Sequence, residues 1–366
     1  KGTKGISLFL VPKFEVNDDG SVGSRNGVST NSIESKMGIK GSPTCVLNFE
    51  NSKGIMIGPE NKGLSSMFTM MNLERIVVGV QGLGIAETAY QNAVAYSKER
   101  KQGKANNSTN GETDLIIKHA DIRRSLMNMK SIIEGQRSFA FWLSQQIDVS
   151  LSHDDKDVRN HASNMVALLT PVIKSFFTDN GVEITNDAIQ VFGGYGYTKD
   201  QGIEQLFRDN RITPIYEGTN SVQAIDLVYR KISSEGVFEN FIKSMDSEIK
   251  NYKDEKNLEN FLNIFEKYKE ILVSFTKWMR DKMNSNKDDA SAACNDYLKV
   301  LGYTALAFAW IKTLKVSFEK QSANKDFYED KINTGKYYFE KILPRAQSHY
   351  VVGTSGSHTT MNAKFN

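Results

Sequence analysis

The segment "RITPIYEGTNSVQ", residues 211–223, carries the carboxylate that is best placed to do chemistry. Glu217 stands between Tyr216 and Gly218, and isoleucines lie just upstream. A carboxylate in an apolar site can have a raised pKa, which suits it to removing a proton. The same acid at the entrance of a helix can also simply complement the positive end of the helix dipole. The segment alone leaves both interpretations open.

A second segment, "QVFGGYGYTKD" at residues 190–200, concentrates glycine. Gly193 and Gly194 are adjacent, and Gly196 stands between two tyrosines. Such glycines end a helix and let the backbone approach another group closely. The segment is either a helix C-cap followed by a turn, or a loop that lies against the flat or phosphate part of a ligand. It lacks the GK[ST] of a P-loop.

Basic residues occur at two further places. "NLER", residues 72–75, places Arg75 among apolar helix residues, and "YSKERKQG", residues 96–103, ends a helix with Lys98, Arg100 and Lys101. Positive charge at a helix C-terminus is favourable without any ligand, and it also suits phosphate binding. Both interpretations of Arg100 stay open on the sequence alone.

Several other chemistries find no support in the sequence. "QGLGIAE", residues 81–87, lacks the third glycine of a dinucleotide fingerprint and falls inside a predicted helix, so it predicts close helix packing. No histidine pair has the spacing of metal ligands, and no serine-nucleophile motif occurs. We therefore expect no metal site and no serine nucleophile.

Composition narrows the class of protein. The 366 residues include 46 basic and 43 acidic side chains, a net charge of +3 that gives no reason to expect nucleic acid as a partner. The mean hydropathy is −0.43, and no apolar run approaches 18 residues, so no membrane span is expected. Cys45 and Cys294 lie far apart, which suggests neither zinc nor a disulfide, and a reducing cytoplasm is the default.

The hydrophobic period changes along the chain from strand-like to helical. Short β-like runs occupy residues 1–62, and periodicity then predicts helices, with Pro171 suggesting a kink or a late start. Asn220 and Gln223 are spaced like a capping box. The last sixteen residues show no periodicity, and we expect a mobile tail. The predicted helices span roughly residues 64–101, 114–149, 155–179, 180–192, 238–252, 256–284, 287–320 and 325–343.

The order and spacing of these motifs resemble the acyl-CoA dehydrogenase family, FAD enzymes that oxidise the Cα–Cβ bond of acyl thioesters. The resemblance covers about residues 1–231 and rests on "LFLVPK", "GSPTCVLNFE", "NLERIVVGVQGLGIAETAYQNAVAYSKER", "QVFGGYGY" and "IYEGTNSVQ". Three features resemble the C-terminally extended branch of the family. They are the insertion after Arg100, the additional helices, and the segment "IIKHADIRRSLMNMKSIIEGQRSFAFW".

The resemblance implies a mainly α fold. Residues 1–62 are expected to be a partial middle β-domain, a remnant of the family's β-barrel domain, and residues 63–234 the dehydrogenase C-terminal helical bundle. Residues 235–366 are expected to be an additional C-terminal helical domain with a mobile tail. The chain opens in a predicted strand without a starting Met, and we expect it to be a piece of a longer protein that lacks the upstream sequence. By itself it is then expected to bind FAD weakly and not to turn over.

The resemblance also implies roles for individual residues. Glu217 matches the family's catalytic base, which removes the pro-R α-proton of the thioester while the β-hydride passes to flavin N5 and a 2-enoyl-CoA forms. The residues that match FAD-binding positions are Arg100, Gln190, Gly194, Thr219 and Ser221, the first three toward the FAD of a neighbouring subunit. The residues that match substrate-binding positions are Asn72, Arg75, Tyr216 and Gly218.

The family's partners follow in the same way. The resemblance implies an acyl-CoA substrate, an electron-transfer flavoprotein as acceptor, and a homodimer or homotetramer. The family often has an aromatic residue in "ERxxFG", whereas this chain has the shorter "ERKQG", residues 99–103, so no flavin-stacking contact is expected there. The alternatives are an acyl-CoA oxidase-like flavoenzyme, or a non-catalytic helical assembly partner.

Overall fold

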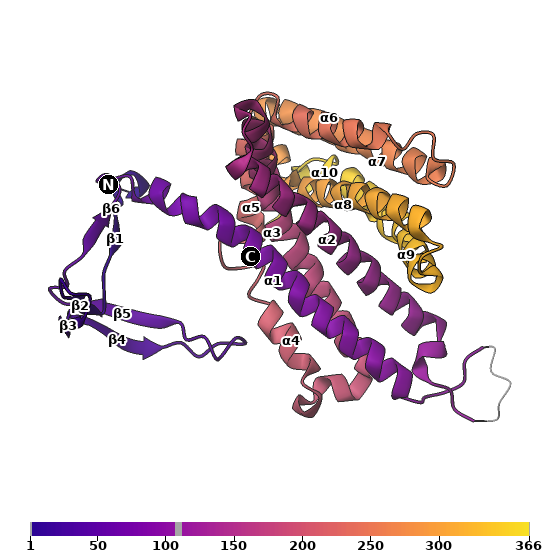
Figure 1. The fold of residues 1–366 in the computed structure, drawn as a ribbon, viewed down its shortest axis with the longest axis horizontal. Coiled ribbons are helices and arrows are strands. Elements are labelled where there is room, and N and C mark those ends of the chain that lie inside the picture. Colours follow the sequence, from indigo (N-terminus) through magenta and orange to yellow (C-terminus); the bar gives the residue numbers. More distant parts are fainter. Residues whose placement is uncertain (1, 107–111, 366) are drawn as a thin grey trace. The chain divides into compact units, whose positions relative to one another are not determined.

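A computed structural model describes residues 2–106 and 112–365 of the chain (Figure 1). Residues 1–74 and residues 75–366 form two compact units, and each is described by itself. Short strands precede a long series of helices, so the mainly helical fold class predicted from the sequence is confirmed.

The first unit contains three separate pairs of antiparallel strands after a single helical turn, Gly2–Gly5. None of the apolar side chains among its described residues is buried. The pairs are therefore held by backbone hydrogen bonds rather than by a hydrophobic core. They are β1 (Leu8–Leu10) with β6 (Ile55–Ile57), β2 (Phe14–Val16) with β3 (Val22–Arg25), and β4 (Val28–Ile33) with β5 (Cys45–Phe49).

Asn26 ties the first unit together and is 3% exposed. Its side-chain amide donates to the carbonyl oxygens of Pro12 (2.8 Å) and Lys53 (2.9 Å), and its oxygen accepts from the Lys53 amide (2.8 Å). Because all of these partners are backbone groups, this one side chain joins three segments that would otherwise have only pairwise strand contacts.

The second unit is built around helix α3. The first helices are α1 (Gly63–Glu99), which begins in the first unit, α2 (Ala120–Ser152), α3 (Lys156–Phe192), α4 (Ile203–Asn210) and α5 (Asn220–Asp226), the last continuing as a π-helical turn, Leu227–Ile232. Short 3₁₀ turns occupy Ile116–Lys118, Gly193–Tyr197 and Lys199–Gln201. Helix α3 contacts α2, α4 and α5, which makes it the centre of this part of the unit.

The C-terminal helices surround α8. They are α6 (Val237–Lys250), α7 (Glu259–Ser285), α8 (Lys287–Lys320), α9 (Lys325–Tyr337), a π-helical turn (Tyr338–Ile342) and α10 (Arg345–Gly353). Helix α8 contacts α7, α9 and α10 and also α2, α3 and α5. The buried apolar residues of the second unit form one continuous core as a result.

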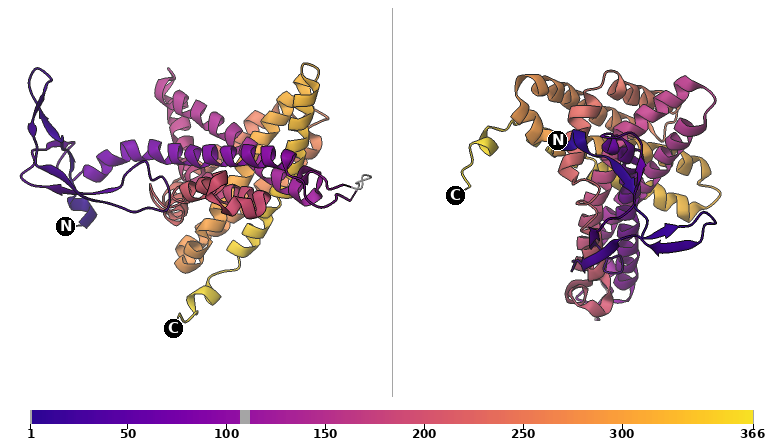
Figure 2. Two further views of the ribbon diagram at one scale, coloured as in Figure 1. Left: turned by 90° about the horizontal axis from the view of Figure 1, so that it is seen from below. Right: turned by 90° about the vertical axis from the view of Figure 1, so that its left-hand side faces the viewer.

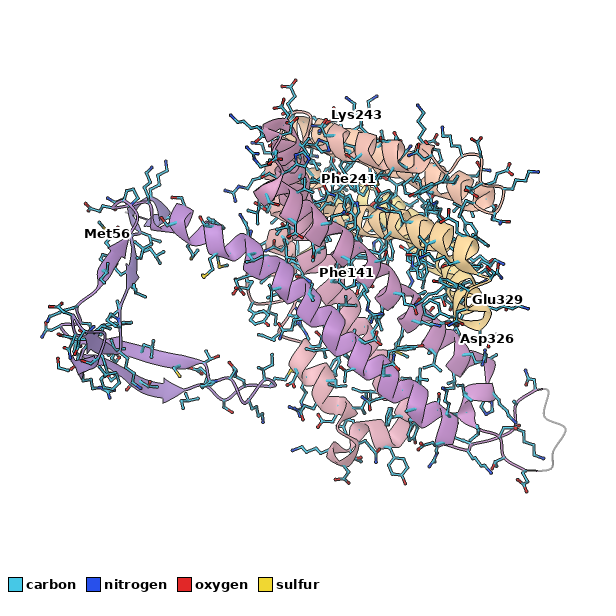
Figure 3. All side chains as sticks on the ribbon, viewed as in Figure 1. Met56, Phe141, Phe241, Lys243, Asp326 and Glu329 are labelled. Atoms are coloured by element: carbon cyan, nitrogen blue, oxygen red, sulfur yellow. The ribbon has the colours of Figure 1, made fainter. Side chains whose placement is uncertain are left out.

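Outer helices of the second unit, such as α6 and α9, are amphipathic and carry charged residues on their exposed faces. On α6, Phe241 is buried while Lys243 is exposed, and Asp326 and Glu329 are exposed on α9 (Figure 3). In the part of the chain that the structure describes, no helix is long and apolar enough to span a membrane.

The prediction of two helices over residues 155–179 and 180–192 is wrong, because α3 runs unbroken from Lys156 to Phe192 with Pro171 inside it. Residues 168–178 are all buried. The packing of this run against neighbouring helices outweighs the hydrogen bond that proline cannot donate.

The final residues also differ from the expected tail without regular structure. Helix α10 extends to Gly353, and a short helix α11 (His358–Met361) follows. The amide and hydroxyl of Ser357 both donate to the Asp289 carboxylate, at 2.8 and 2.7 Å. The C-terminal segment then extends away from the neighbouring helices (Figure 2). Periodicity could not reveal this segment, because two hydrogen bonds rather than an apolar face hold it.

Glycines of α1 allow a close crossing with α3. A Cβ on Gly79 would lie 2.7 Å from the Ile173 carbonyl oxygen, and a Cβ on Gly82 would lie 3.2 Å from Thr178. The prediction that "QGLGIAE" serves close helix packing is confirmed at Gly82. Gly84 of the same segment faces open space instead.

We expect Gly79→Ala to lower the free energy of unfolding by about 1–3 kcal/mol, because the new methyl group would meet backbone that cannot move alone. Gly84→Ala, in the same helix, is the matched control. It should raise the free energy of unfolding by about 0.5–1 kcal/mol, since alanine favours the helix and its methyl group meets nothing. Urea unfolding of the two variants measures both values, and equal effects would contradict the close crossing.

Candidate functional site

Glu217 stands in the middle of a closed loop between α4 and α5. The Asn220 amide donates to the Pro214 carbonyl oxygen at 3.0 Å and joins the two ends of the loop. Glu217 has φ +58° and Gly218 has φ +90°. A left-handed conformation is costly for a residue with a side chain, and residues held in it against that cost are frequent at functional sites.

Two side chains hold the backbone of Glu217 in this conformation. Its carbonyl oxygen accepts from Arg75 Nε at 3.3 Å and from Gln223 Nε2 at 3.2 Å. One carboxylate oxygen of Glu217, Oε2, is buried and has no hydrogen-bond partner among the described residues. The loop therefore fixes the main chain and leaves this carboxylate oxygen available to a ligand or a proton.

Tyr216 connects the loop to α1. Its phenol donates a hydrogen bond to the side-chain oxygen of Gln81. Burial is the main cause of a raised pKa for this phenol. The hydroxyl thus stays protonated and fixes the Tyr216 ring beside α1, next to Glu217.

A buried lysine that sequence reasoning missed lies beneath the same loop. Lys174, on α3, is 0% exposed, and its Nζ donates to Asn220 Oδ1 at 2.9 Å. Burial lowers the pKa of Lys174 to about 8, and the positive charge of Arg75 acts in the same direction. Asp179 and Glu217 oppose the shift. The signal in the sequence is a single cation within the apolar run "LLTPVIKSFF", residues 168–177.

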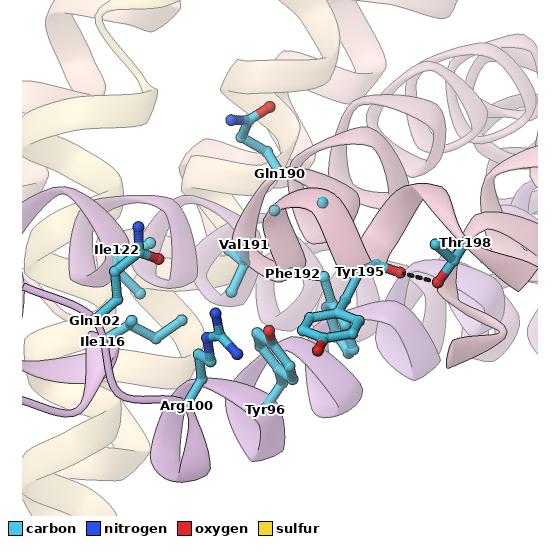
Figure 4. A pocket seen from close by; sticks show the side chains of 12 residues that line it. Tyr96, Arg100, Gln102, Ile116, Ile122, Gln190, Val191, Phe192, Tyr195 and Thr198 are labelled. Atoms are coloured by element: carbon cyan, nitrogen blue, oxygen red, sulfur yellow. Dashed lines mark hydrogen bonds between the residues drawn. The ribbon is translucent and has the colours of Figure 1, made fainter. Parts of the chain in front are cut away.

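A separate pocket of about 560 Å³ lies where α1 and α3 both end (Figure 4). It brings together Arg100, Gln190 and Gly194, three residues that the resemblance assigned to one ligand. The Arg100 guanidinium lies 5.4 Å from the centre of the Tyr195 ring. Among the described residues Arg100 has no carboxylate partner, so its charge is available to an anion.

The glycines at the end of α3 serve two different purposes. Gly193 has φ +60°, and a Cβ on Gly193 or Gly194 would meet nothing within 4 Å. A Cβ on Gly196 would lie 2.5 Å from the Ile189 carbonyl oxygen. Gly196 is therefore required for the turn, whereas Gly193 and Gly194 present an uncovered stretch of backbone to the pocket.

The structure does not bring all of the predicted site residues to this pocket. Thr219 and Ser221 lie at the start of α5, and neither lines the pocket. The predicted capping box is wrong by one residue, because Thr219 is the N-cap and its hydroxyl accepts from the Val222 amide at 3.4 Å. Asn72 is exposed and belongs to the first unit.

Sequence reasoning missed several side chains of the pocket. Tyr96 stacks on Phe192 with ring centres 4.2 Å apart, and Gln102 also lines the wall. The available signal was the position of Tyr96 one helical turn before Arg100. Over residues 2–106 and 112–365, no group of three histidine, cysteine, aspartate or glutamate side chains could hold a metal ion.

The second unit is thus a helical bundle that carries Glu217 on a loop with left-handed backbone and, separately, a pocket lined by Arg100 where α1 and α3 end. Residues 61–232 match the family described as acyl-CoA dehydrogenase, C-terminal domain. Residues 241–364 match the family described as acetyl-CoA dehydrogenase C-terminal like. The chain belongs to the acyl-CoA dehydrogenase family and carries its C-terminal extension domain.

Individual relatives agree with this membership. A 3-methylmercaptopropionyl-CoA dehydrogenase of Ruegeria pomeroyi is 39% identical over 64% of this chain and 40% of its own length. A butyryl-CoA dehydrogenase of Syntrophomonas wolfei is 31% identical over 94% of this chain and 59% of its own length. The chain thus spans about 40 to 59% of the length of these curated relatives.

Solved structures show the same fold. Caenorhabditis elegans ACDH-11, in complex with C11-CoA, aligns over 100% of this chain and 58% of its own with a TM-score of 0.74 at 22% identity. A Bacillus anthracis acyl-CoA dehydrogenase complexed with FAD aligns over 97% of this chain and 62% of its own with a TM-score of 0.73 at 19% identity.

The lowered pKa of Lys174 predicts a pH-dependent stability. Between pH 8 and the ordinary lysine pKa, the unfolded chain binds a proton that the folded chain has lost, so the stability contributed by this position rises with pH. The quantity to measure is the difference in unfolding free energy between the parent and Lys174→Met. We expect this difference to rise from pH 8 to pH 10, by up to about 1 kcal/mol per pH unit.

Lys269→Met is the control for this measurement. Lys269 is also buried, but the hydrogen bonds that its ammonium group donates to Asp246 and Glu266 raise its pKa, although burial acts in the opposite direction. The corresponding difference should stay flat from pH 8 to pH 10. A flat difference for Lys174→Met as well would show that Lys174 is not desolvated.

Proposed function

We propose that this chain forms part of an FAD-dependent acyl-CoA dehydrogenase in which Glu217 is the catalytic base. The observation that carries the proposal is the pair of side chains, Arg75 and Gln223, that hold the Glu217 backbone while one carboxylate oxygen stays without a hydrogen bond. A purely structural acid at a helix entrance would satisfy its oxygens with backbone amides. Family membership supplies the reaction type.

The pocket residues suit the phosphate-bearing part of FAD. Arg100 offers a guanidinium without a carboxylate partner among the described residues, Gln190 offers a side-chain amide, and Gly194 is exposed, whereas the Gly193 N–H already donates to the Gln190 carbonyl oxygen. Cations and exposed backbone are the groups that bind phosphates. We infer that the FAD held here is shared with a neighbouring subunit, in a homodimer or homotetramer.

When bound, FAD accepts the β-hydride at N5, which no protein side chain can do. Glu217 takes the pro-R α-proton, the Cα–H electron pair forms the double bond as the β-hydride leaves, and the product is a 2-enoyl-CoA. In this proposal Tyr216 and Gly218 would bind the thioester, Arg75 and Asn72 would each contact CoA, and Thr219 and Ser221 would contact the flavin.

The remaining assignments follow from the same proposal. The substrate is an acyl-CoA, the electron acceptor an electron-transfer flavoprotein, and the compartment the cytoplasm. Two relatives carry short acyl groups in their names, the 3-methylmercaptopropionyl-CoA and butyryl-CoA dehydrogenases, so a substrate panel should begin with short chains.

Glu217→Gln, made in the FAD-bound holoenzyme, should lower the rate of flavin bleaching by acyl-CoA by about 10²- to 10⁴-fold. The amide keeps the shape of the side chain but cannot accept the proton. Stopped-flow absorbance of the flavin measures the rate, and an unchanged flavin content shows that the fold is intact.

The same experiment separates the alternatives. Bleaching that is unchanged in Glu217→Gln would refute Glu217 as the base. Rapid reoxidation of the flavin by O₂ with release of peroxide would identify an acyl-CoA oxidase-like enzyme. A purified parent protein with stoichiometric flavin that no acyl-CoA bleaches would favour a non-catalytic helical partner.

Arg100→Gln should weaken FAD binding about 10- to 100-fold, because it removes one charge-assisted hydrogen bond to a phosphate. Lys98→Gln removes the same charge from the same helix end but lies outside the pocket, so it should change the affinity less than threefold. Fluorescence titration of the apoprotein with FAD measures both affinities. Equal losses in the two variants would mean that the pocket does not hold a phosphate.

A further inference from the structure

Lys174 is a buried cation that the proposed reaction does not use. It lies on α3 beneath the Glu217 loop and makes one hydrogen bond to a neutral acceptor, Asn220 Oδ1. Burying a lysine is costly unless its ammonium group is paired. A lysine that serves stability alone would be replaced at little cost by an apolar residue, so this position calls for another explanation.

Asn220 makes use of both ends of its side chain. Its Oδ1 accepts from Lys174 Nζ, and its Nδ2 donates to the Asp179 carboxylate at 2.7 Å, to Thr178 Oγ1 at 3.0 Å and to the Ser175 carbonyl oxygen at 3.2 Å. A cation at one end and a carboxylate at the other allow the amide one orientation only. Asn220 is thereby fixed to the buried middle of α3.

The main chain of Asn220 connects this anchored side chain to the Glu217 loop. Its amide donates to the Pro214 carbonyl oxygen, so the seven residues from Pro214 to Asn220 form a loop whose closing point is fixed on α3. Glu217 lies three residues before Asn220. Its left-handed backbone conformation is costly and must be stabilised by neighbouring groups. The position of the Glu217 carboxylate therefore depends on where Asn220 is held.

We propose that Lys174 and Asn220 are positioning residues that hold the Glu217 loop in its reactive conformation by clamping it to α3. This inference rests on the proposed role of Glu217 as the base. Lys174 orients the Asn220 amide, Asn220 closes the loop, and Arg75 and Gln223 then fix the carbonyl group of Glu217. Neither positioning residue exchanges a proton with the substrate.

The charged groups around Lys174 agree with a clamp rather than a second base. Asp179 and Glu217 face it as acids and Arg75 as a cation, while Lys299 and Arg211 face Asp179 from outside the cluster. The Lys174 ammonium is occupied by Asn220. Burial raises the pKa of Asp179, the positive charge of Lys174 opposes that shift, and the Asp179 carboxyl group accepts from Asn220.

Two variants test the clamp in the holoenzyme. Lys174→Met removes the amine from a side chain of similar length, and Asn220→Asp keeps the shape but sets a carboxylate against Asp179. In each, we expect the rate of flavin bleaching at saturating acyl-CoA to fall by about 10- to 100-fold, with the KM for acyl-CoA changed less than threefold. Displacing the base slows proton removal without weakening CoA binding.

A second measurement needs neither substrate nor flavin. Amide hydrogen exchange of residues 211–223 should become at least about tenfold faster in both variants, while exchange in α3 stays unchanged. Lys269→Met removes a comparable buried lysine from α7 and should leave exchange in residues 211–223 and the bleaching rate as in the parent.

The outcomes are distinguishable from failure of the proposed function. If Glu217→Gln bleaches normally, the proposed function is wrong. If Glu217→Gln is inactive while a folded Lys174→Met or Asn220→Asp shows the parent's bleaching rate and exchange, the clamp alone is overturned.

Should Lys174→Met not fold, the shape-preserving Asn220→Asp decides by itself. Loss of exchange protection over the whole second unit in Asn220→Asp would also overturn the clamp, because the network would then be a general support of the fold.

Discussion

The left-handed backbone of Glu217 is the constraint on which the candidate active site depends. A glutamate does not hold φ +58° unaided, so its carbonyl group must be bound from two sides, and Arg75 and Gln223 do this from α1 and α5. Each of these helices must then keep a constant distance from the loop. The strain at one residue thus requires a rigid arrangement of several helices.

Helix α3 meets that requirement because it is one continuous element. Its middle carries Lys174 and the carbonyl and carboxylate groups that bind Asn220, and its end carries Gln190 and the open glycines of the pocket. The close approach of α1 at Gly79 and Gly82 fixes the second wall of that pocket, which ends at Arg100. The loop and the pocket are therefore positioned by the same pair of helices.

The sequence predicted the parts of the site that motifs encode. Short segments at the right spacing predict Glu217 as the base and Arg100, Gln190 and Gly194 as cofactor-binding residues, and the structure brings the last three to one pocket. Lys174 and the capping role of Thr219 were not identified, because their importance arises from contacts across 46 residues and from a shift of one residue at the helix start. The continuity of α3 was missed for a similar reason. Pro171 is a local signal against a helix, and only tertiary burial of residues 168–178 overrides it.

The C-terminal extension contributes to the same rigidity from the opposite side of α3. Gly302 of α8 lies so close to Phe176 that a Cβ there would be 2.5 Å from its ring, and Tyr303 packs edge-on against the same ring at 4.8 Å. The Trp310 indole donates to the Ser131 carbonyl oxygen of α2 at 3.0 Å, from a side chain that is 1% exposed. Phe176 lies two residues after Lys174 on α3. Helix α8 therefore packs against the segment of α3 that anchors the Glu217 loop. A change of packing in the extension would shift that segment of α3 and, with it, the loop.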